Sequence, residues 1–406
     1  MSHMLIVGGG LAAGAAADTL RKEGFDGDVT VVAAEPHPPY QRPPLSKGYL
    51  AGTEGRDAVI LHPEEWYAER GIRLLTGIAA TGLDPAARTV ELGDDSRLAY
   101  DAVLLATGAA PRRLSIRGHD LPGVVTLRRI EDSEALADAL RDGGRRLVVI
   151  GTGWIGMEVA ATARGFGNDV TVLGRGPAPL ASALGEEMGE VFRALHREHG
   201  VDVRTSVEVE RIEGVERAEA VIADGERIDA DLVLVGIGAA PDITLAEESG
   251  LRILDGILTD SALRSSAPYV FAAGDVANAH HPVLQRHVRT EHWANARASG
   301  RVAARAMLGQ PASHDGIPYF YTDQFDLGME LSGYAPLMTD AELVVRGDLE
   351  AREFIAFWVS DGRVVAGMNV NVWDVNKQVQ ALIRSGERLD TRQLRDPDVP
   401  LDSLLS

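Results

Sequence analysis

Cysteine is absent from this chain of 406 residues, and its absence removes several kinds of chemistry at once. Disulfide bonds cannot form, and zinc sites or iron–sulfur clusters held by cysteine thiolates lack their ligands. An enzyme that passes electrons through a pair of thiols, or that stabilises a sulfenic acid, is excluded for the same reason. Any redox chemistry must therefore reside in a bound cofactor.

Lysine and long apolar runs are also scarce. Only Lys22, Lys47 and Lys377 occur among 40 basic residues, so almost all positive charge is arginine. No apolar run reaches the roughly 18 residues that a membrane helix needs, and residues 1–4 lead directly into an expected strand, without the regions of a signal peptide. We therefore expect a cytoplasmic protein that does not enter the membrane.

The net charge of −20 bears on the partners of the protein. Such a charge argues against nonspecific binding to nucleic acid or to an anionic membrane, although a local basic face could bind an acidic protein. His280, His281 and His287 do not have the spacing that places three ligands on one face, and no carboxylates complete a set. We therefore expect no metal site.

Two segments combine an apolar strand with a glycine-rich turn, which we call the first glycine turn (residues 8–13) and the second glycine turn (residues 151–156). Glycines at these places let backbone N–H groups and a helix N-terminus approach a pyrophosphate. One such turn alone could be an ordinary strand-to-helix turn, but the pair favours two dinucleotides, a permanent flavin and a visiting nicotinamide. The residues that make these turns are Gly8, Gly10 and Ala13 in the first, and Gly151, Gly153 and Gly156 in the second.

Charged residues follow the first turn. Glu35 comes just after an expected strand at 29–32, where an acid can hold the ribose hydroxyls of an adenine dinucleotide. The alternative is an exposed loop carboxylate. The proline-rich stretch 36–47 is expected to be a rigid loop, too stiff for a helix, that presents Arg42 and Lys47.

The order of motifs repeats along the chain. An apolar strand ends at Thr107-Gly108, and a similar strand after residue 231 ends at Ile237-Gly238. A further strand runs into Gly274-Asp275. From about residue 316, alternating apolar residues predict an antiparallel sheet, followed by a helix at about 373–385. The fold class is therefore α/β, with two Rossmann-like nucleotide-binding domains and a C-terminal α+β domain.

These motifs, together with Arg-Pro-Pro-Leu-Ser-Lys at 42–47, Glu-His-Trp at 291–293 and Pro-Tyr-Phe-Tyr at 318–321, carry a resemblance that covers essentially the whole chain. The chain resembles the FAD-dependent ferredoxin reductases that serve bacterial Rieske dioxygenases and cytochrome P450 systems. The resemblance implies a glutathione-reductase-like architecture of an FAD-binding domain (1–112 and 243–320), an NAD(P)-binding domain (113–242) and a C-terminal domain (321–406).

The resemblance also implies roles for single residues. Asp275 is expected to contact the ribityl chain of the flavin, Ala12 and Ala13 the pyrophosphate, and Ala80 the adenine side. Arg128 and Trp293 are expected at the flavin itself. Further residues implied in binding FAD or the nicotinamide coenzyme are Arg42, Thr107, Gly108, Ile155, Ile237, Gly238, Gly274, Glu291, His292 and Tyr321.

Lys47 and Glu158 are the expected catalytic pair. In proteins of this kind a lysine beside flavin N5 stabilises the anionic reduced flavin, and it pairs with the glutamate that follows the second glycine turn. Glu158 would also hold the nicotinamide carboxamide; the alternative is a surface glutamate on a helix. The chain departs from the family in having Ala34 where relatives often have an acid, and Tyr321 where they commonly have tryptophan.

The coenzyme preference stays open in the sequence. An acid after the second strand of this unit would select NADH by binding the 2′-hydroxyl, but Leu173 is followed here by Gly174 and Arg175. Arg175 could hold a 2′-phosphate, which favours NADPH, whereas the resemblance favours NADH.

The expected mechanism is hydride transfer from NAD(P)H to FAD, followed by single-electron transfers to an iron–sulfur ferredoxin that supplies a cytochrome P450 or Rieske oxygenase. Arg297, Arg301 and Arg305 recur at helical spacing and form a basic stripe that could bind the acidic ferredoxin; the alternative is a solvated arginine face. Rival functions are an NAD(P)H oxidase or peroxidase, which usually relies on a cysteine, and a flavoprotein of the apoptosis-inducing-factor type, whose targeting and basic segments are absent here.

Overall fold

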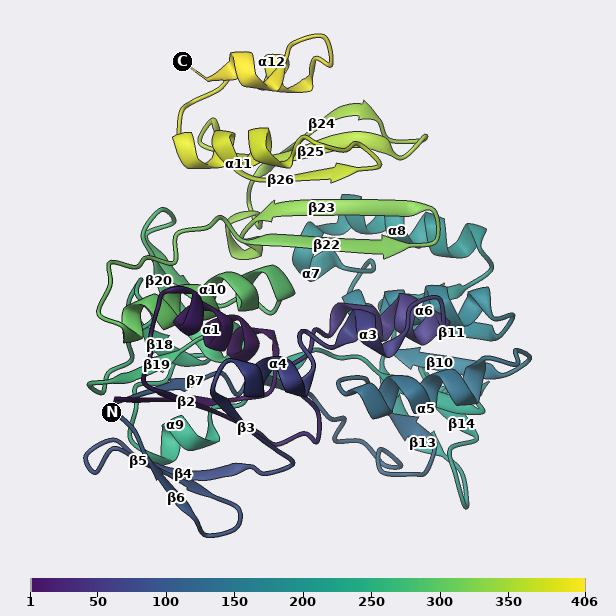
Figure 1. Cartoon of the computed structure of the whole chain (residues 1–406). Coiled ribbons are helices and arrows are strands. Elements are labelled where there is room, and N and C mark those ends of the chain that lie inside the picture. The colour runs from purple at the N-terminus through teal and green to yellow at the C-terminus, as the bar shows by residue number, and fades with distance from the viewer. Residues whose placement is uncertain (1, 406) are drawn as a thin grey trace. The chain divides into compact units, whose positions relative to one another are not determined.

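The computed structural model describes residues 2–405, and its contacts divide the chain into two compact units (Figure 1). Unit 1 comprises Met1–Pro43, Gly55–Ala110 and Ala240–Gly316, and unit 2 comprises Pro44–Glu54, Pro111–Ala239 and Ile317–Ser406. The segment 44–54, which carries Lys47, thus groups with the second nucleotide-binding region rather than with the first. The division into three domains stays a prediction.

A five-stranded parallel sheet organises unit 1, in the order β19-β7-β1-β2-β3. Strands β1, β2, β7 and β19 are largely apolar and buried, as expected for a parallel sheet covered on its faces, whereas in the edge strand β3 only Ile72 is buried and Arg73 is exposed. The bounds are β1 (His3–Val7), β2 (Asp28–Ala33), β3 (Ile72–Thr76), β7 (Ala102–Leu105) and β19 (Val270–Ala272). Both strands predicted at the first nucleotide unit are therefore present.

Helix α1 (Leu11–Lys22) and helix α10 (Trp293–Met307) pack against each other in unit 1. A Cβ at Gly300 would lie 2.3 Å from the backbone oxygen of Ala12, so this glycine is what allows the two helices to approach so closely. The smaller elements of the unit are α3 (Arg56–Val59), α4 (Glu64–Glu69), α9 (Thr244–Glu248), the sheet of β4 (Ala80–Asp84), β5 (Thr89–Leu92) and β6 (Arg97–Ala99), the sheet of β18 (Ile257–Thr259), β20 (Ala277–His281) and β21 (Arg286–Val288), and the turn η2 (Gly274–Val276).

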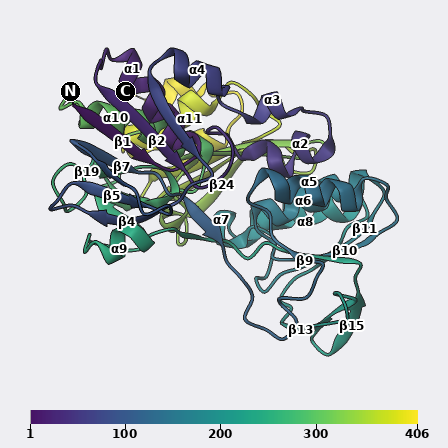
Figure 2. The same cartoon turned by 60° about the horizontal axis from the view of Figure 1, so that its bottom comes forward.

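Unit 2 contains a second parallel sheet, in the order β12-β11-β10-β16-β9. Helix α6 packs on β10 and β11 and helix α8 on β12, and a small antiparallel sheet of β13, β14 and β15 lies at one end of this region (Figure 2). The bounds are β9 (Val124–Val125), α5 (Ile130–Leu140), β10 (Arg146–Ile150), α6 (Trp154–Gly165), β11 (Asp169–Leu173), α7 (Ala181–Leu184), α8 (Glu186–Glu198), β12 (Asp202–Arg204), β13 (Val209–Glu213), β14 (Ala220–Ala223), β15 (Glu226–Asp229) and β16 (Leu232–Val235).

The C-terminal part of unit 2 is the predicted antiparallel sheet, in the order β22-β23-β26-β25-β24. Phe192 and Leu195 of α8 belong to the same apolar core as Phe354 and Trp358 of this sheet. The bounds are β22 (Tyr319–Gln324), β23 (Leu327–Gly333), η3 (Ala335–Leu337), β24 (Glu342–Asp348), β25 (Glu353–Ser360), β26 (Arg363–Val370), α11 (Asn376–Ser385), α12 (Thr391–Arg395) and η4 (Leu401–Leu404).

Two local predictions need correction. The helix expected from residue 373 begins at Asn376, because Asp374 has a left-handed backbone with a φ of 64° that a helix cannot contain. The proline-rich stretch 36–47 is not wholly a loop, since η1 (Pro43–Ser46) is a 3-10 turn within it; α2 (Gly48–Ala51) begins just after the stretch. Proline fits the first turn of a helix, where its missing N–H costs no hydrogen bond. The strands β8 (Ala109–Pro111) and β17 (Ala239–Pro241) lie where the chain passes from one unit to the other.

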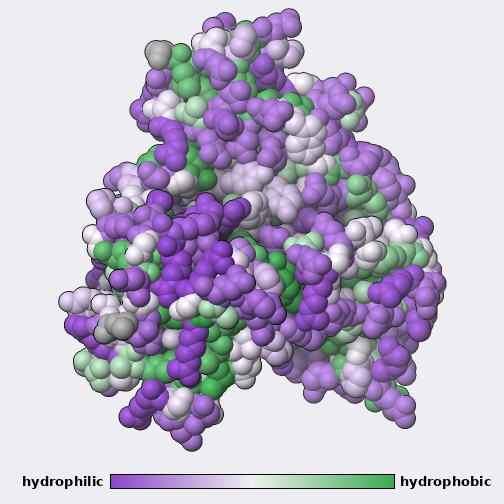
Figure 3. Space-filling view, viewed as in Figure 1, coloured by the Kyte–Doolittle hydropathy of each residue, from purple (hydrophilic) through white to green (hydrophobic). Residues whose placement is uncertain are grey.

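Hydrophilic residues prevail on the face drawn in Figure 3, and apolar residues gather there only in small groups. Among residues 2–405, no helix is both long enough and apolar enough to cross a membrane.

Candidate active site

The first glycine turn joins β1 to α1 and is shaped as a cradle for a phosphate. A Cβ at Gly8 would lie 2.1 Å from the backbone oxygen of Ala106, and the φ of Gly8 is 142°, so this position requires glycine. At Gly10 a Cβ would meet nothing within 4 Å, and no side chain caps the N-terminus of α1 behind it. Open space before an uncapped helix N-terminus fits the pyrophosphate of FAD.

The Gly274-Asp275 turn adjoins this cradle. A Cβ at Gly274, whose φ is 78°, would lie 3.1 Å from the Cβ of Ala12. The N–H of Gly274 donates to Ser299 Oγ at 2.9 Å, which ties the turn to α10. The structure thus brings Asp275 close to the start of α1, although their positions in the sequence are far apart.

Glu35 lies two residues after the end of β2, is half-buried and is bound by two partners. Arg42 Nη2 is 2.9 Å from Glu35 Oε1, and the hydroxyl of Tyr40 donates to Glu35 Oε2 at 2.6 Å. Burial opposes the charge of Arg42, but Tyr40 and Glu35 outweigh burial and raise its pKa. The predicted ribose-binding acid is therefore held in place by the predicted arginine.

The other predicted residues of unit 1 lie in the same set of elements. Thr107 Oγ1 donates to the backbone oxygen of Asp242 at 2.7 Å. His292 Nδ1 accepts from the N–H of Ala294 at the start of α10, where Trp293 is the first residue. The remaining placements are Gly108 after β7, Ala80 at the start of β4 and Glu291 paired with Arg289.

The second glycine turn joins β10 to α6 in unit 2. A Cβ at Gly151 would lie 2.3 Å from the backbone oxygen of Gly236, and one at Gly156 would lie 2.4 Å from that of Gly151. Gly153 precedes α6 without a side-chain cap. The predicted apolar contacts Ile155 and Ile237 are exposed large hydrophobic residues, so a ligand could cover them. This turn fits a second, more open nucleotide site.

Lys47 and Glu158 form the ion pair that was expected. Lys47 Nζ is 2.6 Å from Glu158 Oε1, and the two side chains are 18% and 5% exposed. Glu158 lies in α6 and is buried, so the alternative of a surface glutamate is wrong. The ring of Tyr321 lies 5.4 Å from Lys47 Nζ, and burial raises the pKa of this tyrosine to about 12, which keeps the phenol protonated.

Polar residues that sequence reasoning missed complete the surroundings of Glu158. Ser46 Oγ donates to Glu158 Oε2 at 2.5 Å, and Thr322 Oγ1 donates to Glu158 Oε1 at 2.7 Å. Asp323 lies close to the pair, and burial raises its pKa while Lys47 opposes that rise. The available signal was weak: Ser46 neighbours Lys47, and Thr322 neighbours Tyr321 in the chain.

The coenzyme-selecting position follows β11. A Cβ at Gly174 would lie 2.4 Å from Thr152 Cγ2, so Thr152 of the second glycine turn occupies the space of a side chain there. Arg175 is exposed.

Two other predicted residues lie elsewhere in unit 2. Gly238, predicted to bind the nicotinamide coenzyme, has a φ of 101°. Arg128 precedes α5, and its N–H donates to Asp132 Oδ2 at 2.9 Å.

The basic stripe is present on α10. Arg297, Arg301 and Arg305 are all exposed, but Arg305 Nε is 2.8 Å from Glu23 Oε1, and this ion pair partly neutralises the charge of Arg305.

Within residues 2–405, no group of three or more potential ligands is placed to hold a metal ion. The rings of His280 and His287 meet edge to face.

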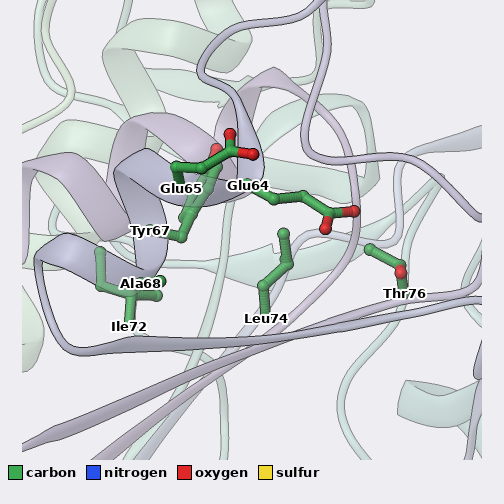
Figure 4. Close-up of a pocket in the computed structure, with 7 residues that line it drawn as sticks. All are labelled: Glu64, Glu65, Tyr67, Ala68, Ile72, Leu74 and Thr76. Carbon is green, nitrogen blue, oxygen red and sulfur yellow. The ribbon is translucent and has the colours of Figure 1, made fainter.

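A pocket of about 370 Å³ lies in unit 1, outside the predicted site (Figure 4). Glu64 and Glu65 project from α4, and Leu74 and Thr76 from β3. Tyr67 also lines the pocket, and its hydroxyl lies 3.5 Å from where a Cβ at Gly14 of α1 would stand. None of its lining residues is among the predicted site residues.

The fold and these two cradles define a nucleotide-dependent oxidoreductase, and comparison with known proteins agrees. The family model described as "Pyridine nucleotide-disulphide oxidoreductase" matches residues 2–300, and that described as "Reductase C-terminal" matches residues 319–405. The chain belongs to the pyridine nucleotide-disulphide oxidoreductase family. Because it has no cysteine, the disulphide chemistry in the family's name is not open to it.

The relatives confirm the predicted resemblance to ferredoxin reductases of oxygenase systems. The chain is 38% identical over 403 residues to the "Biphenyl dioxygenase system ferredoxin--NAD(+) reductase component" of Paraburkholderia xenovorans, covering 98% of this chain and 97% of that protein. It is 34% identical over 411 residues to putidaredoxin reductase of Pseudomonas putida, covering 100% and 97%. The solved covalent putidaredoxin reductase–putidaredoxin complex matches with a TM-score of 0.95 and 33% identity, covering 99% of this chain and 98% of that chain. Proteins of this class use FAD and NAD(P)H.

Proposed function

We propose that this protein is a ferredoxin reductase that moves electrons from NAD(P)H through FAD to a small iron–sulfur ferredoxin, which supplies a cytochrome P450 or Rieske oxygenase. The observation that carries the proposal is the presence of two nucleotide cradles in a chain that has no cysteine. Without a thiol to receive them, electrons from a bound flavin must leave to an external acceptor.

Bound FAD supplies the step from a two-electron donor to a one-electron acceptor. The chain supplies binding and charge: the first glycine turn would hold the pyrophosphate, Glu35 the ribose and Asp275 the ribityl chain. Lys47 would stabilise negative charge on the reduced flavin, and Glu158 would hold the nicotinamide carboxamide. The buried ion pair supports these last roles, because it holds both side chains in place before the ligands arrive.

We also propose that Arg297 and Arg301 contribute to binding the acidic ferredoxin. Their exposure on one face of α10 supports this role, and because the chain as a whole carries a net charge of −20, the stripe would be a local attraction for an acidic partner. We place the protein in the cytoplasm, and we expect it to bind neither nucleic acid nor membrane.

The test is NAD(P)H-dependent reduction of cytochrome c by the FAD-loaded protein, with and without an added ferredoxin. The proposal expects fast reduction only when ferredoxin is present, while ferricyanide is reduced in either case. High turnover with oxygen or peroxide alone would instead support an oxidase or peroxidase. Absence of turnover with every acceptor would support a binding role of the apoptosis-inducing-factor type.

A further inference from the structure

A continuous chain of buried hydrogen bonds runs from α8 through β22 to Glu158, entirely within unit 2. His196 Nε2 lies 2.8 Å from Gln324 Oε1, and Gln324 Nε2 donates to Thr322 Oγ1 at 3.2 Å. Thr322 then donates to Glu158 Oε1 at 2.7 Å. None of these four residues is more than 4% exposed.

The direction of every bond in this chain is determined. A carboxylate paired with Lys47 can only accept, so the hydroxyl of Thr322 must donate to Glu158. The oxygen of Thr322 then accepts from the amide nitrogen of Gln324, which leaves the amide oxygen to accept from an Nε2–H of His196. The tautomer of His196 follows, with a bare Nδ1 that has no partner among the described residues.

His196 is suited to hold the far end of this chain. Burial lowers its pKa to about 4, although the hydrogen bond to Gln324 opposes that shift. The ring therefore stays neutral near pH 7 and keeps a single donor on Nε2. Phe325 packs edge to face on it, with ring centroids 5.0 Å apart, which limits rotation.

The strand geometry explains why the C-terminal sheet can reach Glu158. Alternate residues of a strand point to the same face, so Thr322 and Gln324 share one face of β22. Ser332 in the neighbouring β23 is also buried, but its hydroxyl donates to Asn376 Oδ1 at 2.8 Å. It is not hydrogen-bonded to His196, Gln324, Thr322 or Glu158. It offers a matched control.

We propose that Thr322, Gln324 and His196 are positioning residues, which orient the Glu158 carboxylate toward Lys47 and thereby set the affinity for the nicotinamide coenzyme. The inference rests on the proposed function, in which Glu158 holds the nicotinamide. A buried carboxylate that loses a donor is less well solvated and less ordered, so it binds the next partner less well.

The experiment compares Thr322→Val with Thr322→Ser and Ser332→Ala in the FAD-loaded protein. We titrate each variant with NAD⁺ and NADP⁺, following the flavin spectrum, and measure the reduction of the flavin by NADH and NADPH in a stopped-flow instrument. Thr322→Val should weaken coenzyme binding by about tenfold to a hundredfold, the range of one hydrogen bond to a charged group. Thr322→Ser should restore binding to within about threefold, which is under a kilocalorie of binding energy, and Ser332→Ala should match the wild type.

Gln324→Met is the second variant, in case Thr322→Val does not retain FAD, and it should act in the same direction with a smaller effect. The double variant Thr322→Val/Glu158→Gln should bind coenzyme no more weakly than Glu158→Gln alone, because the threonine acts through the glutamate. Unchanged binding in Thr322→Val and Gln324→Met, or additive losses in the double variant, would overturn the inference. The proposed function fails separately, if the wild-type holoenzyme reduces no ferredoxin.

Discussion

Acidification should lower the free energy of unfolding of unit 2 through His196, and replacing this residue with glutamine should remove that contribution. The histidine is fully buried, and burial lowers its pKa from the ordinary 6.5 to about 4, with the bond to Gln324 opposing the shift. Between about pH 4 and pH 6.5 this histidine is protonated in the unfolded chain and neutral in the folded chain. Stability from this residue is therefore complete above pH 6.5 and is lost as the pH falls toward 4.

The size of the loss follows from the two pKa values. At pH 7.5 protonation of His196 in the unfolded chain lowers the free energy of unfolding by a negligible amount. At pH 5.0 it lowers the free energy of unfolding by about 2 kcal/mol, because one pKa unit corresponds to about 1.4 kcal/mol. Glutamine does not titrate, and its side-chain nitrogen can stand near Nε2 and still donate to Gln324. Wild type and His196→Gln share all the carboxylates, so the difference between them isolates the histidine.

Urea unfolding of the holoenzyme, followed by circular dichroism at both pH values, measures this difference. We expect the wild type to lose about 2 kcal/mol more than His196→Gln on going from pH 7.5 to pH 5.0. Equal losses in the two proteins would refute the reasoning, since His196 would then not be a buried neutral group that resists protonation.

Three further outcomes test the cradles and the stripe. Gly8→Ala should retain FAD at least about tenfold less tightly, because a methyl group 2.1 Å from the oxygen of Ala106 displaces the turn; full flavin content after gel filtration would contradict this. Arg175→Ala should raise the KM for NADPH by about tenfold while leaving that for NADH unchanged, if this arginine holds a 2′-phosphate; a wild type that strongly prefers NADH rules that role out. Arg301→Glu should slow reduction of ferredoxin but not of ferricyanide, whereas Arg73→Glu on the exposed side of β3 serves as the charge-matched control. Equal rates in these two variants would argue against the stripe.

Local rules were enough to predict the two cradles. The strand, the glycines and the following helix lie within about a dozen residues, and the φ values of 142° at Gly8 and 117° at Gly151 are ones that glycine alone adopts readily. The basic stripe on α10 could be predicted for a similar reason, since helical spacing places residues four apart on one face.

The surroundings of Glu158 could not be derived in this way. Lys47 and Glu158 were expected from a resemblance, whereas nothing in the spacing of Ser46, His196 and Gln324 connects them. Helix boundaries also escaped local rules, as the left-handed Asp374 before α11 shows.

The sequence by itself predicted two dinucleotide sites, excluded any part for a thiol and showed that Arg175 follows the strand ending at Leu173 without an acid before it. Only the tertiary structure decided that Glu158 is buried, which of its oxygens each donor serves and that Thr152 fills the space beside Gly174. The physical reason is the separation along the sequence of the residues that interact. The conformation of a glycine turn is set by residues next to it in the chain, whereas the hydrogen bonds of a buried carboxylate come from donors that folding brings from distant elements.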